Sequence, residues 1–265
     1  MRPILALSAT LLLAACATSA APRASGSAAS NPGDGHALLA QMRDRYAGKW
    51  FRTLTFVQKT TTKRPDGTEQ VATWYEAQRG SRLRIDMGDP ALGNGALYTA
   101  DSLYVMRAGK VARARAEGNP FLPLIVGVYL QPLAETEAQL AAYKVDLGRV
   151  HSQDWEGRAT YVVGASAPSD STSPQFWVDR ERLIVVRFLL PLFPTPDNHL
   201  QDARLENNVP VGGGWLATRV RMLDKGVPLQ SEEYSDWKVD VALPESFFQP
   251  EHWSEGPHWA KPAGQ

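Results

Sequence analysis

Few residues of this sequence have the type and spacing that acid–base or nucleophilic chemistry requires. Ser166 follows a Gly-Ala dipeptide and lacks the Gly-x-Ser-x-Gly pattern of a nucleophile elbow. None of the five histidines stands in a motif typical of a catalytic triad. The carboxylates Glu135 and Glu137, like Glu232 and Glu233, are more typical of a solvated surface than of an acid–base pair. We therefore expect no catalytic residue and no enzymatic activity.

Metal and phosphate sites are equally poorly supported. His252 and His258 stand six residues apart, and two histidines alone cannot complete a tetrahedral metal site. The glycines of 212–214 lead into a strand pattern rather than a helix, so they indicate a hairpin turn and not a phosphate cradle. We expect neither a metal nor a cofactor.

The single cysteine, Cys16, has a recognisable context. It follows a positively charged start, an apolar run from Ile4 to Leu13 and two alanines, which is the pattern of an export signal. The run is too short to span a bilayer as a permanent helix. Leu13-Ala14-Ala15-Cys16 resembles the lipobox of bacterial lipoproteins, and by that resemblance residues 1–15 are a signal peptide and Cys16 is lipidated. An ordinary secretory signal with an incidental cysteine is the alternative.

Composition divides the rest of the chain. Residues 16–35 are rich in Ala, Ser, Gly and Pro and predict a flexible tether. Residues 36–250 form the predicted folded domain, and 251–265 form a C-terminal tail. From Pro244 onward we expect the first part of the chain to pack down and its last residues to stay loose. The chain has 265 residues, zero formal net charge and interspersed acidic and basic residues, so we expect no nucleic-acid partner and favour a monomer.

The folded part begins with a helix and continues as a meander. Asp34 can cap a helix over His36 to Gly48, in which Leu38, Leu39, Met42 and Tyr46 form one apolar stripe. Alternating patterns then predict strands over Phe51–Thr62, Gln70–Gln78, Arg82–Met87, Ala96–Arg107 (broken at Ala100-Asp101), Lys144–Val150, Arg158–Ala165, Leu200–Asn207, Trp215–Leu223 and Leu229–Val241. In Arg82–Met87 apolar and charged residues alternate, which predicts one dry face and one wet face.

Two segments break this alternation. The hairpin from Phe176 to Phe188 is apolar at nearly every position of its second strand, so we expect it in the middle of the sheet with both faces covered. The segment Asn119–Leu130 is apolar all round and too short to cross a membrane, which predicts a helix buried on every side. A more amphipathic helix over Leu133–Tyr143 should lie over it.

These elements predict a mainly β fold with some helix, in which a single antiparallel sheet curves into an incomplete half β-barrel plugged by helices. The chain from about His36 to Pro250 resembles the outer-membrane lipoprotein-sorting superfamily, which includes the Lol carrier and receptor proteins (LolA/LolB-like). The motifs that carry the resemblance are Leu38–Tyr46, Thr53–Gln58, Phe176–Asp179, Tyr234–Val239 and Leu243–Phe248.

The resemblance implies an unclosed barrel whose apolar inner side binds acyl chains of lipoproteins or other lipids, in lipoprotein sorting or lipid transfer. The predicted anchor makes the layout closer to the anchored receptor. Ala17, rather than aspartate, follows Cys16, and by the same resemblance this favours the periplasmic face of the outer membrane. The expected partners are therefore a lipid or an acylated protein, and the membrane through the anchor.

Candidate ligand-contacting residues are those expected between the sheet and the apolar helix. A filled core is the alternative, in which the protein is a non-enzymatic scaffold or regulator that binds another envelope protein. The apolar stretch from Leu189 to Pro194, between strands, predicts an exposed loop that touches membrane or partner, or else a loop folded onto the core. The predicted cavity residues are Trp74, Leu83, Ile85, Phe121, Leu124, Ile125, Val128 and Trp177, and the predicted loop contacts are Leu190, Leu192 and Phe193.

Overall fold

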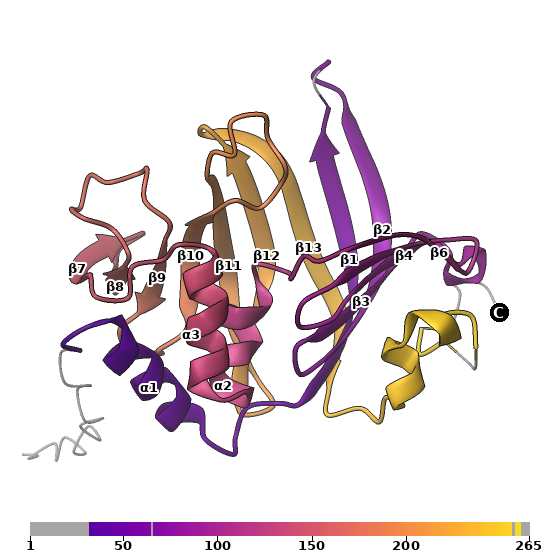
Figure 1. The fold of residues 1–265 in the computed structure, drawn as a ribbon, viewed down its shortest axis with the longest axis horizontal. Helices are drawn as coiled ribbons and strands as arrows, with labels where there is room; N and C mark the ends of the chain where they lie inside the picture. Colours follow the sequence, from indigo (N-terminus) through magenta and orange to yellow (C-terminus); the bar gives the residue numbers. More distant parts are fainter. Residues whose placement is uncertain (1–31, 65, 256–257, 261–265) are drawn as a thin grey trace, which may run out of the picture.

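The computed structural model describes residues 32–64, 66–255 and 258–260. The predicted signal peptide, Cys16 and most of the predicted tether lie outside the described residues. In the described part, the chain forms one antiparallel sheet in the strand order β6-β5-β4-β3-β2-β1-β13-β12-β11-β10-β9-β8-β7, with helices against it (Figure 1). The sheet is open, because β6 and β7 are its two edges and do not pair with each other.

The chain order explains this arrangement. The strands β1 (Thr53–Lys63), β2 (Glu69–Arg79), β3 (Arg82–Met87), β4 (Gly95–Tyr98), β5 (Leu103–Arg107) and β6 (Lys110–Arg115) run from the centre to one edge. The chain then crosses to the other edge and returns to the centre through the strands β7 (Val150–Trp155), β8 (Arg158–Val163), β9 (Gln175–Asp179), β10 (Val185–Leu190), β11 (Gln201–Val211), β12 (Gly214–Asp224) and β13 (Val227–Val239).

The crossing segment contains the helices. They are η2 (Pro123–Gly127), which is a π-helical turn, α2 (Val128–Leu130) and α3 (Leu133–Ala142), and α1 (Gly35–Tyr46) packs beside them. Shorter 3-10 turns are η1 (Pro90–Leu92), η3 (Glu245–Phe248) and η4 (Pro250–His252). None of the helices in the described ranges is long and apolar enough to cross a membrane.

The predicted helix at the start is confirmed. It begins at Gly35, and the carboxylate of Asp34 accepts a hydrogen bond from the backbone N–H of Ala37 at 2.8 Å. Its apolar stripe is buried, because Leu38, Leu39 and Met42 have no exposed surface.

The hairpin of β9 and β10 does not lie in the middle of the sheet, as its apolar pattern predicted. It is third and fourth from the β7 edge, and the centre is the pairing of β1 with β13. Both faces of the hairpin are nevertheless covered, as predicted: all of β9 is buried, and only Arg187 of β10 is partly exposed. Coverage therefore reflects what packs on a strand and not its place in the sheet order.

Two edge strands differ from the sequence prediction. The predicted strand Lys144–Val150 is wrong: these residues form a turn, and β7 begins where the prediction ended. The strand β6 was not predicted at all, because its side chains are exposed and give no dry face to detect.

We call the face that contacts η2 and α2 the inner face, and the opposite one the outer face. Cross-strand partners share a face, so the register places Phe188, Ala203, Glu232, Glu76 and Ile85 on the inner face. In Figure 1, the three α-helices lie together toward the β7 side, and the C-terminal segment lies toward the β6 side.

The C-terminal segment, residues 243–260 as described, covers the outer face of β2 to β5. The predicted wet face of β3 is therefore dry. Arg84 is buried between the rings of Phe247 and Trp253, with its guanidinium carbon 4.0 and 3.9 Å from the ring centroids. Asp86, fully buried, accepts from Nε of Arg84 at 2.8 Å and contacts Nε2 of His258 at 3.0 Å. Charged residues in a strand can thus be buried when another segment satisfies them.

Candidate functional site

The candidate site is the space between the inner face and the segment 119–131, which we call the plug. The carbonyl of Pro123 accepts the backbone N–H of Val128, five residues on, which is the π-helical bond. A π-helical turn inside a helix is rare and frequently occurs at functional sites. The sequence predicted a helix here but not this geometry.

Both ends of the plug are fixed by polar contacts. At its start, the side-chain oxygen of Asn119 accepts the N–H of Phe121 at 2.9 Å. At its end, Gln131 donates to Thr136 at 2.9 Å and to Gln139 at 2.7 Å, which ties the plug to α3. The plug is therefore anchored at its ends and held mainly by apolar packing between them.

The plug straddles two apolar clusters. Leu124 and Val128 pack into the larger cluster, on the half of the sheet toward β7. Leu122 and Val126 pack into a smaller cluster on β3 to β5. Phe121 meets Phe188 of β10 edge to face, with ring centroids 4.7 Å apart. Most of this segment is buried between the two clusters, but the predicted burial on every side is incomplete, because Phe121, Ile125 and Leu130 are partly exposed.

Aromatic residues hold the C-terminal end of the plug. Tyr129 stacks on Trp50 with centroids 3.7 Å apart, and Tyr46 contacts both rings edge on. The hydroxyl of Tyr129 donates to the carbonyl of Leu183 at 3.0 Å, and burial raises the pKa of that hydroxyl well above its ordinary value. Tyr46 donates in the same way to the carbonyl of Arg182. The plug, α1 and the β9–β10 turn are thus one packed unit.

Clefts remain on both sides of the plug. One of about 70 Å³ opens between the plug and strands β1 and β10 to β13, and its lining is mostly apolar. The other, of about 200 Å³, lies between the plug, α3 and the β4–β5 turn. Ligand sites for small molecules usually measure about 300–1,000 Å³. A whole acyl chain would therefore need the plug to move.

The predicted cavity residues divide into three groups. Phe121, Leu124 and Ile125 line the apolar cleft. Trp74, Leu83 and Ile85 belong to the smaller cluster, and Val128 is buried in the larger one.

Trp177 is misplaced by the prediction. It pairs with Arg187 on the outer face, whereas its neighbour Phe176 pairs with Phe188 on the inner face. The guanidinium of Arg187 lies between Trp177 and Trp155, 4.3 and 4.2 Å from their ring centroids. A run with two covered faces shows no alternation, so the sequence could not assign its faces.

The predicted exposed loop is also partly wrong. Leu190 belongs to β10 and is fully buried. Leu192 and Phe193 are half-buried against the larger cluster, and their backbone N–H groups donate to the side-chain oxygen of Gln201 at 2.7 and 3.3 Å. Membrane or partner contact by these two side chains stays a prediction.

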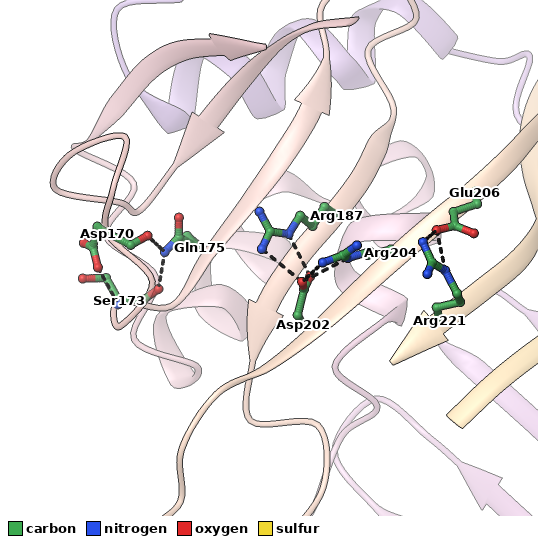
Figure 2. A network of polar contacts seen from close by, with 8 residues as sticks. All are labelled: Asp170, Ser173, Gln175, Arg187, Asp202, Arg204, Glu206 and Arg221. Atoms are coloured by element: carbon green, nitrogen blue, oxygen red, sulfur yellow. Dashed lines mark hydrogen bonds and ion pairs between the residues drawn. The ribbon is translucent and has the colours of Figure 1, made fainter. Parts of the chain in front are cut away.

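The outer face near β10 and β11 carries the polar network of Figure 2. Asp202 accepts a two-point contact from Arg187 at 2.8 and 3.0 Å and another from Arg204 at 3.1 and 3.0 Å. Farther along the sheet, Arg221 donates to Glu206 at 2.7 Å. These cations are already paired with carboxylates, so the network stabilises the outer face.

Sequence reasoning missed a row of polar side chains on the inner face, between the two apolar clusters. We call Gln58, Thr60, Glu76, Gln78, Glu232 and Tyr234 the polar strip, and all but Tyr234 are buried. Glu232 had been assigned with Glu233 to a solvated surface, which is wrong for Glu232. Only Glu233 is exposed, since the two residues face opposite sides of β13.

The strip has unusual electrostatics. Burial, and then the nearby carboxyl of Glu232, raise the pKa of Glu76 well above its ordinary value. Burial also raises the pKa of Glu232, although hydrogen bonds from Tyr234 and Gln230 oppose the shift. Burial raises the pKa of Tyr98, on the same face, to about 12.

The histidines of the described chain all take part in polar contacts. Each of the five histidine rings contacts a carboxylate, an amide or a backbone group, and none hydrogen-bonds a hydroxyl or thiol in the described ranges. Among the described residues no group of three His, Cys, Asp or Glu side chains could hold a metal ion.

The open antiparallel sheet with helices on its inner face is the fold predicted from sequence, and solved structures share it. The chain is similar to a DUF1329 family protein from Desulfovibrio piger (14% identity, TM-score 0.56, 81% of this chain and 95% of that chain). It is also similar to a LolA superfamily protein from Nitrosomonas europaea (15% identity, TM-score 0.51, 79% and 96%).

A third similar structure is an outer membrane lipoprotein-sorting protein domain from Vibrio parahaemolyticus (11% identity, TM-score 0.52, 81% and 96%). The LolA-like fold is therefore established for this chain. No protein-family model matches the sequence, and no curated protein sequence matches it.

Proposed function

We propose that this protein binds acyl chains, of a lipid or of an acylated protein, on the inner face of its sheet and beneath the plug. The observation that carries the proposal is the plug itself: an apolar segment with a π-helical turn, set between two apolar clusters and flanked by clefts. Apolar concave surfaces with few polar groups are the usual sites for such ligands. Movement of the plug away from the sheet would join the clefts into one binding site.

The location follows from the same proposal. We infer an exported protein, anchored through Cys16 at the periplasmic face of the outer membrane, whose role lies in lipoprotein sorting or lipid transfer. The resemblance of its fold to lipoprotein-sorting proteins supports this inference. We expect it to act by binding and not as an enzyme.

Uptake of a fluorescent fatty-acid analogue tests the proposal. The test uses the full chain carrying Cys16→Ala, so that the protein can be studied without detergent. With no other substitution, this chain should bind the analogue saturably, at about one site per chain. Ile125→Trp would fill the apolar cleft and should abolish binding, at a stability cost of about 1–3 kcal/mol for overpacking.

Leu92→Trp is the matched control, because Leu92 is exposed and belongs to neither of the plug's clusters. It should bind the analogue as the parent does. Absence of saturable binding by the parent chain would contradict the proposal.

One observation favours a second function. The cleft of about 70 Å³ is small for a ligand site, so the inner face is largely filled in this conformation. A filled sheet would serve as a scaffold or regulator that binds another envelope protein. Unchanged hydrogen exchange in residues 121–130 when the fatty-acid analogue is added would favour this alternative.

A further inference from the structure

The polar strip contains hydrogen-bond acceptors that lack donors. Glu76 is only 5% exposed and makes no side-chain hydrogen bond to any described residue. Two residues along the same face of β2, Gln78 donates its amide N–H to the carbonyl of Gly80 at 2.6 Å, which fixes the orientation of the amide. The other end of that amide, Oε1, is buried and has no partner.

Such an arrangement is costly if it is only structural. Burying a polar group without a hydrogen bond is unfavourable, and natural proteins rarely leave it so. A neighbouring cation would relieve it, but the inner-face positions of β1 to β4 and β13 carry no lysine, arginine or histidine in the described chain. The plug residues that pack on this region, Leu122 and Val126, are apolar.

The two acceptors lie between the two apolar clusters. Gln78 pairs with Leu54, which lines the apolar cleft, and with Leu83 of the smaller cluster. Glu76 pairs with Phe56 and with Ile85 in the same two directions. An acyl chain beneath the plug could therefore place its polar end against both groups.

The remaining titratable groups of the strip do not satisfy Glu76. Glu232 is also acidic, and its oxygens accept from Tyr234 at 2.6 Å and from Gln230 at 2.8 Å. Tyr98, from β4, presents a phenol whose pKa is raised, so it stays neutral. Arg113 and Arg115 share the inner face, but they belong to β6, beyond β3, β4 and β5, and Arg115 pairs with Glu117. The charged group that shifts the pKa of Glu76 is the carboxyl of Glu232.

We propose that Glu76 and Oε1 of Gln78 form a subsite for the protonated primary amine of an amphiphilic ligand. The inference rests on the proposed function and names its ligand class: a single-chain or multi-chain amphiphile with an ammonium head. A primary ammonium offers three donors and one positive charge, which matches a carboxylate and an amide oxygen that both lack a donor.

Binding would be coupled to a proton. The raised pKa of Glu76 favours its neutral form in the empty protein, whereas the ammonium favours the carboxylate. The carboxyl proton leaves to solvent as the ammonium takes its place, so the bound pair is neutral overall.

Head-group competition on the full chain carrying Cys16→Ala tests the subsite. A neutral fluorescent probe is displaced by dodecylamine, dodecanol or dodecanoic acid, all at pH 7 and below their micelle concentrations. The three compounds share one chain length, so any difference reports the head group. We expect dodecylamine to bind at least about tenfold more tightly than dodecanol, as a charge-assisted hydrogen bond allows, and dodecanoic acid to bind most weakly.

Substitutions at Glu76 and Gln78 test whether these two side chains cause the preference for dodecylamine. Glu76→Gln keeps the size of the side chain and should remove the preference for dodecylamine while leaving dodecanol affinity unchanged. Gln78→Met, which removes the amide oxygen, should weaken dodecylamine alone. Glu69→Gln is the matched control, because Glu69 is exposed on the same strand and should keep the full preference. Calorimetry in buffers of different ionisation enthalpy should show proton release with the amine in the parent chain and none in Glu76→Gln.

The outcomes separate the two proposals. Equal binding of all three amphiphiles by the parent chain overturns the ammonium subsite and leaves acyl-chain binding standing. A preference that persists in Glu76→Gln also overturns it. Failure of every amphiphile to displace or bind would overturn the proposed function and the subsite with it. Because the head-group series uses the parent chain, the test stands even if a variant does not fold.

Discussion

At the scale of single residues, two neighbours that both line the apolar cleft differ in how completely they are packed. Leu124 has no exposed surface, whereas Ile125 is partly exposed and lines the apolar cleft. Leu124→Ala should lower the free energy of unfolding by about 2–5 kcal/mol, the cost of a large-to-alanine change in a packed core. Ile125→Ala should cost less and enlarge the cleft.

Urea unfolding measures both variants, and fatty-acid uptake is measured alongside. The expected pattern is a large loss of stability for Leu124→Ala, and a small loss with altered uptake for Ile125→Ala. Equal losses of stability, with uptake unchanged in both, would indicate that the plug is ordinary core.

A second residue-scale prediction concerns pH. Because the pKa of Glu76 is higher in the fold than the ordinary value of 4.5, the folded state holds its proton while the unfolded chain releases it. Stability therefore falls as pH rises from about 4.5 toward the raised pKa, with a slope of up to about 1.4 kcal/mol per pH unit for this group. Glu76→Gln removes that slope.

The measurement is urea unfolding between pH 4 and 8. Glu76→Gln should match the parent chain near pH 4 and become progressively more stable than it above pH 5. Glu233→Gln, exposed on β13, should follow the parent chain throughout. Parallel curves for Glu76→Gln and the parent would refute a buried, neutral carboxyl.

The sequence could not reveal this row of residues for a physical reason. Glu232 and Glu233 are identical and adjacent, and only the register of β13 decides which of them faces the plug. The same limit applies to Trp177, whose neighbours are apolar on both sides. In contrast, Leu38, Leu39 and Met42 were assigned correctly, because helical spacing puts them on one stripe without reference to any other element.

At the scale of elements, the C-terminal segment acts as a cover for the outer face. Trp253 is only 2% exposed and packs on the buried guanidinium of Arg84. Arg84 also donates to the carbonyl of Trp253 at 2.9 Å. The segment therefore gives the guanidinium a hydrogen-bond partner where it lies beside an apolar cluster.

Removing the ring of Trp253 should weaken the packing of the C-terminal segment on the outer face. Trp253→Ala should lower the free energy of unfolding by about 3–5 kcal/mol, as large aromatic truncations in cores do. Val227→Ala, at an exposed position, should change it by less than about 0.5 kcal/mol. Chemical unfolding measures both, and a loss for Trp253→Ala as small as that of the control would show that the segment does not contribute to the fold.

Elements were predicted well wherever one face is dry. The bounds of β3 were predicted to the residue, and the break between β4 and β5 was placed correctly. The errors are at β6 and β7, which are the two edges of the sheet. Edge strands are commonly polar, because apolar edges would pair with other chains, and a polar strand has no hydrophobic period to find.

At the scale of the whole molecule, the order of strands is set by long-range pairing. The sheet is centred on β1 and β13, which are 174 residues apart by first residue (227 minus 53). Local patterns carry no information about that pairing, so the apolar hairpin of β9 and β10 looked central. The crossing from β6 to β7 passes over the inner face, which is why the plug lies against that face.

The last prediction places this fold on a membrane. If Cys16 is lipidated, its acyl chains hold the domain at the bilayer, since each buried methylene contributes about 0.8 kcal/mol and two or more chains give stable anchoring. Cys16 and the segment after it lie outside the described residues, so the prediction depends on the lipobox-like Leu13-Ala14-Ala15-Cys16. Mass spectrometry of the membrane fraction should find an acylated N-terminal cysteine and no residues 1–15.

Cys16→Ala should move the protein from the membrane fraction to the soluble fraction without changing its unfolding curve, because residues 32 onward contain the fold. Such a soluble chain that still bound the fatty-acid analogue would show that anchoring and ligand binding are separate properties of the molecule. Wild-type protein from the membrane fraction that keeps residues 1–15, or that carries no acyl group on Cys16, would show that the predicted lipidation is wrong.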